Sequence, residues 1–363
     1  AGDLLSFFSA LSWAIYSILI KKISHQYPVL FTTRRVFFYS ILTLLPWFCY
    51  EPLPLDFSIL LQKEVIFNLL FLSLIASSLC FYIWNIIIKN LGAVHTNNYI
   101  YFNCSDYSNQ SSSTCETWRI IGVFDGKIKL IRGSQIGTYA WDNKDTTTGA
   151  ENNYGKNDWT DARLMKLLNP GYESEATGGS LYYNSGSGNC YAWYSNATTT
   201  CDFTSTGIKN DITRNLISDT TYYLGGHNSS SVYPNEIYEK ERGTTVYSGR
   251  PTSWIGKIAI AYPSDYGYAA DLGKCTKQLG SYNDTTCTSN NWMNTIIAPN
   301  NGWLLTPSSG NERYVWRVYS PGDVYYNIYA YIASGVAPVL YLGSELSVKA
   351  GIGSSSDPYQ ISV

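Results

Sequence analysis

Three long apolar runs near the N-terminus restrict the fold of this chain more than any other feature. They are Leu4–Ile20, Val36–Tyr50 and Val65–Ile88. A helix needs about 20 apolar residues to cross the hydrocarbon core of a bilayer, so the first and third runs are expected to span a membrane. The second run reaches that length only when Phe31–Thr33 or the segment near Pro52 is added. A buried core helix is the alternative for that run.

The charged residues between the apolar runs predict their orientation. Four basic residues crowd the loop after the first run: Lys21, Lys22, Arg34 and Arg35. Because cytoplasmic loops carry the excess of Lys and Arg, this loop is expected to be cytoplasmic, with Ala1 outside. Three crossings then return the chain to the cytoplasmic side at Lys89. Since the sequence starts at Ala1 without a Met, we also expect it to be a fragment.

The composition changes near Thr96 and divides the chain into two parts. Beyond Phe102 the sequence is rich in Tyr, Trp, Gly, Ser, Thr and Asn and poor in Leu, which is typical of a loop-rich secreted or surface domain. Neither part has the clustered Lys and Arg that neutralise phosphates, so nucleic acid is not expected as a partner. The predicted domains are residues 1–96, which contact membrane lipid through residues 4–88, and residues 97–363.

Short motifs in the first part resemble a known transporter family. Gly2–Leu5 and Ser12–Tyr16 precede Lys21-Lys22, and Leu74–Ser78 and Tyr82–Asn85 precede Leu91–Val94. These segments resemble the first and third helices in the second repeat of EamA-type drug/metabolite transporters. The resemblance covers roughly the first hundred residues.

The resemblance implies half of a ten-helix carrier of small metabolites. Such carriers are built from two inverted repeats, with the substrate path between them near the middle of the bilayer. Ser12, Tyr16 and Asn85 are candidates for that path, because polar groups in lipid usually face protein or water. Packing between helices is the alternative role for them. Only three helices and the start of a fourth are present, so the sequence as written is not expected to transport.

Six cysteines beyond Phe102 fall into three close pairs. The pairs are Cys104 with Cys115, Cys190 with Cys201, and Cys275 with Cys287. Six cysteines allow fifteen connectivities, and the nearly equal spacings favour disulfides between neighbours. Metal ligation is the competing interpretation, although no C-x-x-C or histidine-spaced pattern is present.

The disulfides conflict with the predicted topology. Stable disulfides indicate an oxidising exterior, whereas the three crossings place this domain in the cytoplasm. The stretch Asn97–Phe102 could begin a fourth membrane helix, but Asn103–Asp106 ends its apolar character. We therefore favour a chimera, in which Asn97–Phe102 is a sequence shared by two genes joined by mis-assembly or recombination, over a natural fusion. Long sequencing reads across the junction would decide between them.

Local patterns in the second part predict an α+β fold. Thr117–Phe124 and Lys127–Arg132 alternate around Asp125-Gly126, a dipeptide typical of a two-residue hairpin turn. Asp158 is expected to be the N-cap of a helix over Ala162–Leu168. Further helices are predicted over Ile208–Ile217 and Asn235–Arg242. Further strands are predicted over Gly256–Tyr262, Trp303–Thr306, Tyr314–Tyr319, Val324–Tyr329 and Val336–Leu342.

The second part also resembles a known domain type. The resemblance covers nearly all of residues 97–363 and is carried by Trp118–Val123, Tyr154–Trp159, Glu241–Tyr247, Tyr262–Tyr268, Leu305–Ser309 and Pro338–Leu342. These segments resemble a surface-domain family of Gram-positive gut bacteria whose function is not established. Members usually carry Arg where this chain has Ala337, so any role that this Arg has in the family is not expected in this chain. The layout of helices and strands is similar to C-type-lectin-like folds, which is an analogy at the level of the fold.

No residue pattern in the second part predicts catalysis. His227 is the single histidine beyond Phe102 and lies in a Gly- and Ser-rich loop, so a Ser-His-Asp site would depend on a loop residue. Paired carboxylates (Asp158 with Asp161, and Asp142 with Asp145) could serve glycoside hydrolysis, but capping and turn roles explain them. Calcium ligation by Asp142, Asn143 and Asp145 matches no specific spacing. We therefore expect no enzyme, metal or cofactor.

The abundant aromatic residues predict binding instead. Aromatic rings beside polar groups suit sugar rings or peptide partners, although most Trp residues are expected in the core. The candidate ligand contacts are Trp193, Trp141 and Trp254. We predict a non-catalytic surface or adhesion domain for a glycan or protein ligand, joined to a non-functional transporter fragment. The alternative is an EamA-like membrane transporter with an accessory domain.

Overall fold

The computed structural model describes residues 35, 38–39, 97–143, 154–193, 199–343 and 346–363. The chain divides into two compact units, Ala1–His95 and Thr96–Val363, and we describe the second. The three predicted membrane runs lie outside the described residues, apart from isolated positions in the second run. Among the helices of the described part, none combines the length and apolar character that crossing a membrane requires.

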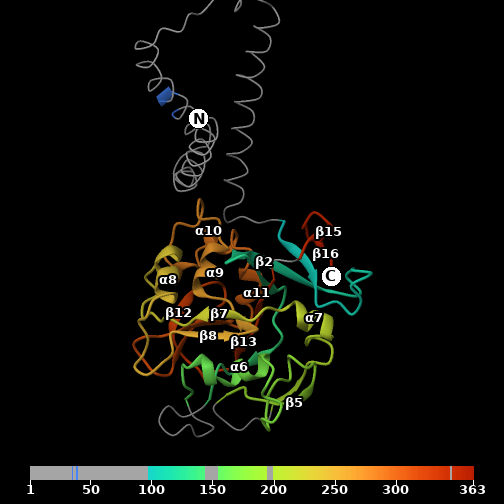
Figure 1. Ribbon diagram of the computed structural model, residues 1–363. Coiled ribbons are helices and arrows are strands. Elements are labelled where there is room, and N and C mark those ends of the chain that lie inside the picture. Colours follow the sequence, from blue (N-terminus) through green and yellow to red (C-terminus); the bar gives the residue numbers. More distant parts are fainter. Residues whose placement is uncertain (1–34, 36–37, 40–96, 144–153, 194–198, 344–345) are drawn as a thin grey trace, which may run out of the picture. The chain divides into compact units, whose positions relative to one another are not determined.

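An antiparallel five-stranded sheet forms the centre of the second unit (Figure 1). Its strand order is β1-β2-β3-β14-β9, in which β1 is Tyr99–Phe102, β2 is Glu116–Phe124, β3 is Lys127–Arg132, β14 is Pro338–Leu342 and β9 is Ile258–Ile260. The hairpin of β2 and β3 confirms the prediction made from Asp125-Gly126. Both residues adopt positive φ angles, 51° and 75°, as a tight turn of this kind requires.

Apolar side chains cover both faces of this sheet. Successive side chains of a strand point to opposite faces, and in β3 Leu130 and Ile131 belong to two different core clusters. Leu340 and Val339 divide in the same way in β14. Five Trp side chains are fully buried around the sheets: Trp118, Trp141, Trp159, Trp303 and Trp316. Aromatic residues therefore supply the largest side chains of the core, as the shortage of Leu predicts.

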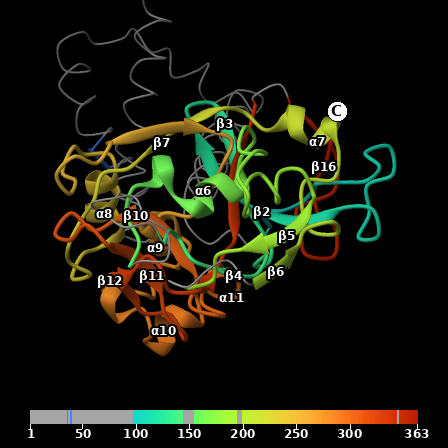
Figure 2. The ribbon, with the colours of Figure 1, turned by 90° about the horizontal axis from the view of Figure 1, so that it is seen from below.

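Smaller sheets and short helices complete the unit (Figures 1 and 2). A three-stranded sheet contains β10 (Trp303–Pro307), β11 (Tyr314–Val318) and β12 (Val324–Tyr329). The two-stranded sheets pair β4 (Thr138–Tyr139) with β13 (Ser334–Gly335), β5 (Ser187–Cys190) with β6 (Thr199–Asp202), β7 (Thr220–Tyr223) with β8 (Ser253–Gly256), and β15 (Val348–Ala350) with β16 (Gln360–Ile361). The helices are η2 (Trp159–Asp161), α6 (Arg163–Leu168), α7 (Asp211–Leu216), α8 (Pro234–Glu241), α9 (Pro263–Tyr268), η3 (Leu279–Ser281), α10 (Thr285–Thr288) and α11 (Asn294–Ile297). The unit is thus β-rich with short helices.

Two local predictions need correction. Asp158 caps the short 3-10 helix η2, where its carboxylate accepts a hydrogen bond from the amide of Thr160, and α6 starts after Ala162. Ala162 is extended, with φ −65° and ψ 143°, so it separates the two helices. The strand expected over Gly256–Tyr262 is shorter, because its last residues lead into α9.

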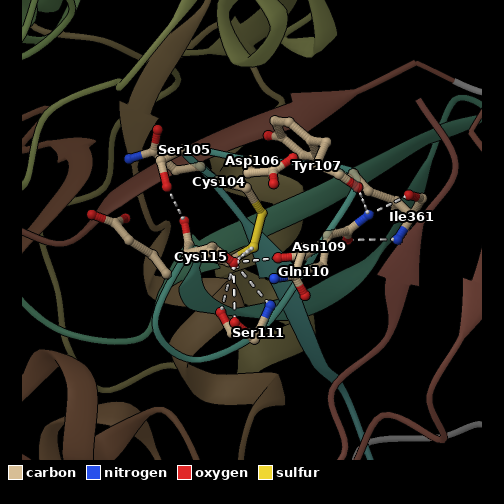
Figure 3. Close-up of a disulfide and its surroundings, with 12 residues drawn as sticks. Cys104, Ser105, Asp106, Tyr107, Asn109, Gln110, Ser111, Cys115 and Ile361 are labelled. Atoms are coloured by element: carbon tan, nitrogen blue, oxygen red, sulfur yellow. Dashed lines mark hydrogen bonds between the residues drawn. A yellow bond between two sulfur atoms is a disulfide. The ribbon is translucent and has the colours of Figure 1, made fainter.

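The structure contains the three neighbouring disulfides, Cys104–Cys115, Cys190–Cys201 and Cys275–Cys287. The first closes a loop between β1 and β2 (Figure 3). In that loop, the side-chain amide of Gln110 donates a hydrogen bond to the carbonyl of Ile361 and accepts one from its amide. The disulfide-closed loop is therefore anchored to β16 near the C-terminus.

β1 belongs to the second unit through hydrogen bonds on both of its edges. It pairs with β2, and the amides of Tyr99 and Tyr101 donate to the carbonyls of Gly353 and Tyr359. Ile100 and Phe102 are buried in the core. The stretch that could have begun a fourth membrane helix is therefore a strand of this sheet.

Candidate functional site

Five aromatic residues from three parts of the second unit meet at its surface. We call Tyr154, Trp193, Tyr314, Tyr329 and Tyr331 the aromatic cluster. Tyr154 and Trp193 are the most exposed members, with 47% and 50% of their surface accessible. The Tyr154 ring lies 5.5 Å from the rings of both Tyr329 and Tyr331, and the Trp193 ring lies 6.4 Å from Tyr331. These spacings are typical of aromatic contact.

Two antiparallel strands position one side of the cluster. Tyr314 in β11 is directly opposite Tyr329 in β12, and their rings meet edge to face at 4.9 Å. Tyr331 follows Tyr329 by two residues, and their rings lie 5.6 Å apart. Cross-strand aromatic pairs of this kind stabilise a sheet by roughly 0.2–1 kcal/mol. The strands therefore present tyrosine rings from a rigid support.

Loops supply the two most exposed rings. Tyr154 precedes Gly155, whose φ of +85° is left-handed, and a Cβ at Gly155 would collide with the carbonyl oxygen of Asp142. Only glycine fits this turn without strain. Trp193 lies between the cysteines of the Cys190–Cys201 disulfide. Local constraints thus hold Tyr154 beside the end of β12 and Trp193 beside the turn that follows this strand.

Polar groups border the rings of the cluster. The Arg313 guanidinium carbon lies 5.3 Å from the centre of the Tyr154 ring, a distance that permits a cation–π interaction. A hydrogen bond with Tyr329 raises the pKa of the Tyr314 hydroxyl above its usual value, so these two hydroxyls are bonded to each other at the edge of the cluster. Rings with hydroxyls and an arginine nearby can stack on a ligand and also bond to its polar groups.

The structure does not bring the three predicted Trp residues together. Trp193 belongs to the aromatic cluster, but Trp141 is fully buried and its ring packs 5.1 Å from that of Trp159. A ligand at the surface does not reach Trp141, which corrects the prediction for this residue. Trp254 is partly buried, and its ring lies 5.6 Å from the Tyr222 ring. Its main contacts are with core aromatics.

The residues considered for chemistry have structural partners. The His227 ring stacks on Trp316 at 6.4 Å, and burial lowers the pKa of its imidazole. The Asp142 carboxylate accepts hydrogen bonds from the amides of Lys156 and Arg163 and is buried. Asp158 caps η2, and Asp161 forms an ion pair with Lys166 at 3.3 Å. Asp145 lies outside the described residues.

No group of three or more His, Cys, Asp or Glu side chains that could hold a metal ion occurs in the described part of the chain. Asn143, one of the calcium ligands considered above, is buried and its side-chain amide donates to the Trp193 carbonyl at 3.5 Å. It therefore helps to hold the loop that carries Trp193.

Four members of the aromatic cluster were missed from the sequence. Tyr329 is the last residue of β12, and Tyr331 lies two residues further on, just beyond the strand. The closely spaced tyrosines of this segment were a usable signal for an aromatic surface. Tyr154 had no such signal, because its place depends on the turn at Gly155.

One comparison with known proteins gives a match, which covers the first unit and the start of the second. Residues 1–103 match the model of the EamA-like transporter family. No curated protein and no solved structure matches the chain. The predicted path residues Ser12, Tyr16 and Asn85 fall within the match but lie outside the described residues. The resemblance of the second unit to a bacterial surface-domain family has no support in these comparisons and stays a prediction.

Proposed function

We propose that the second unit is a non-catalytic, adhesion-type binding module that takes a glycan or a protein partner on the aromatic cluster. The single observation that carries the proposal is the contact of two exposed loop rings, Tyr154 and Trp193, with tyrosines at the end of β12 and in the turn that follows it. Aromatic anchors that lose little conformational entropy are typical of binding surfaces.

A glycan suits this surface better than an extended apolar segment. The tyrosine hydroxyls and Arg313 provide donors and acceptors at the edges of the rings. Sugar rings combine an apolar face with many hydroxyls, and they therefore match this mixture. The three disulfides support an oxidising, extracellular location for the module. A C-type-lectin-like fold for this unit is also part of the proposal.

Truncation of Trp193 tests the binding surface. We expect Trp193→Ala to weaken ligand binding about 30-fold, because loss of a hot-spot aromatic typically costs about 2 kcal/mol. A glycan array and pull-down assays with the chain identify the ligand, and titration then gives the affinity of each variant. Tyr154→Ala should weaken the same interaction.

Two matched variants control for indirect effects. His227→Ala and Tyr268→Ala change side chains outside the aromatic cluster and should leave binding within about twofold. If Trp193→Ala binds the ligand as tightly as the unchanged chain, the proposal that the aromatic cluster is the binding surface is wrong. Hydrolysis of a tested glycan or peptide that one carboxylate substitution abolishes would refute the non-catalytic proposal.

The family match supports a second candidate function. Residues 1–103 match transporters, which supports a membrane location for this part and a carrier with an accessory domain. Saturable uptake of a small metabolite by vesicles containing the chain would favour this candidate.

We further propose that the two units come from different genes. The family match extends to residue 103, yet residues 99–102 form β1 within the sheet of the second unit. A short sequence that both source genes share at this position would explain how the two genes were joined there. Sequencing reads that show one uninterrupted locus would contradict it.

A further inference from the structure

A second concave site lies away from the aromatic cluster, at the end of the β2–β3 hairpin. The pocket has a volume of about 480 Å³, which is in the range of small-molecule sites. Its wall is contributed by the hairpin, by β7 and by α8 with the residues that follow it. The lining aromatic and basic residues are Phe124, Tyr223, Tyr238, Tyr262, Tyr341 and Arg242.

Arg242 contributes a guanidinium group to the wall of the pocket. Its Nη1 donates to the carbonyl of Tyr238 at 3.2 Å and lies 3.4 Å from a Glu241 oxygen. The guanidinium carbon is 3.4 Å from the centre of the Tyr238 ring. Within the described part of the chain, Nε and Nη2 have no hydrogen-bond partner. One edge of the guanidinium is thus held in place while two of its donors remain for a ligand.

A buried lysine contacts the same rings. Lys129 is fully buried, and its Nζ lies 4.4 Å from the centre of the Tyr262 ring and 5.5 Å from those of Phe124 and Tyr341. Asp265 pairs with this ammonium at 2.5 Å and balances its charge. The pocket rings therefore contact cations and are poorly suited to a cationic ligand.

The carboxyls near the pocket leave the charge of Arg242 largely uncompensated. Glu241 is fully buried, and burial raises the pKa of its carboxyl to about 8, so it is mostly protonated near pH 7. Asp125 lines the pocket at the hairpin turn and is exposed to solvent. Water screens an exposed carboxylate, whereas the guanidinium is partly buried among rings.

We propose that this pocket binds a carboxylated sugar, with the carboxylate on Arg242 and the sugar ring against the tyrosines. The volume exceeds what an inorganic anion fills, and the aromatic walls suit the apolar face of a sugar ring. Thr221 and Asp125 lie in the same wall and offer polar groups for the sugar hydroxyls. Hexuronates and sialic acids share the required chemistry.

Calorimetric titration of the full chain in detergent tests the proposal with three probes. Methyl glucuronide and N-acetylneuraminic acid represent the two sources of a sugar carboxylate, and saturable binding of either supports the site. The methyl ester of methyl glucuronide keeps the ring and removes the charge, so it should bind at least about tenfold more weakly. Equal affinity for acid and ester, or no binding of either acid, would overturn the proposal.

Arg242→Gln provides the matching variant. It should weaken binding of the acid about 10- to 100-fold, because charge-assisted hydrogen bonds are lost, and it should reduce the difference between acid and ester. Lys349→Gln removes the same charge at an exposed residue outside the pocket and should leave the affinity unchanged. Unaltered acid binding by Arg242→Gln would contradict the assignment. The ester comparison needs no variant, so it decides the matter even if Arg242→Gln folds poorly.

Discussion

Asp265→Ala is expected to lower the free energy of unfolding of the second unit by about 3–5 kcal/mol, because it leaves a buried ammonium without its partner. Lys129 Nζ lies 2.5 Å from the Asp265 carboxylate, and the two side chains are 0% and 5% exposed. The same carboxylate accepts a hydrogen bond from the Tyr262 amide at the start of α9. The variant therefore loses both a counter-ion and a helix cap.

Denaturant unfolding of the chain measures this effect. Lys274→Ala is the control, because Lys274 pairs with Asp271 at the surface, where an ion pair contributes about 1 kcal/mol or less. The double variant Lys129→Met with Asp265→Asn removes both charges and keeps an acceptor for the Tyr262 amide. It should recover most of the loss. If Asp265→Ala lowers the free energy of unfolding by no more than Lys274→Ala does, Lys129 does not depend on Asp265.

Glu241 is expected to make the second unit less stable as the pH rises. Burial raises the pKa of this carboxyl to about 8, from an ordinary value of 4.5. Below pH 4.5 the folded and unfolded chains both hold the proton. Between pH 4.5 and 8 the unfolded chain releases it and the folded chain retains it, so stability falls. The full shift corresponds to at most about 5 kcal/mol, since each pKa unit is worth about 1.4 kcal/mol.

Comparison with Glu241→Gln isolates this group from the other titrating residues. Glutamine keeps the shape of the side chain and does not titrate. The free energy of unfolding of the unchanged chain, minus that of the variant, should therefore drop by several kcal/mol between pH 5 and 8. The charged neighbours Arg242 and Asp265 are present in both proteins. Unfolding measured at the two pH values gives the difference. A difference that does not vary with pH would contradict a raised pKa.

Local chemistry made part of the fold predictable. The Asp125-Gly126 turn and the neighbouring cysteine pairs depend on residues close in sequence, and the structure contains both. The strand Val324–Tyr329 was predicted with the bounds that the structure gives. Helix α9 was missed, although Pro263 at its first turn and Asp265 three residues after Tyr262 are usable start signals.

Distant contacts explain what the sequence could not predict. Asn97–Phe102 suits a helix or a strand by its own composition, and the choice is made by hydrogen bonds to Gly353 and Tyr359 near the other end of the chain. The aromatic cluster has the same origin, because Tyr154, Trp193 and β12 are far apart in sequence. The polar residues that follow Trp141 in the sequence gave no indication that its side chain lies in the core.

Residues from Asn97 onward are expected to form an independent disulfide-stapled domain that starts with β1. The most direct measurement is cooperative unfolding of residues 97–363 produced under oxidising conditions, compared with residues 104–363. We predict a single cooperative transition for 97–363 and a large loss of stability for 104–363, because removing β1 exposes the core around Ile100 and Phe102. Unfolded or non-cooperative 97–363, or equal stability of the two proteins, would contradict the account.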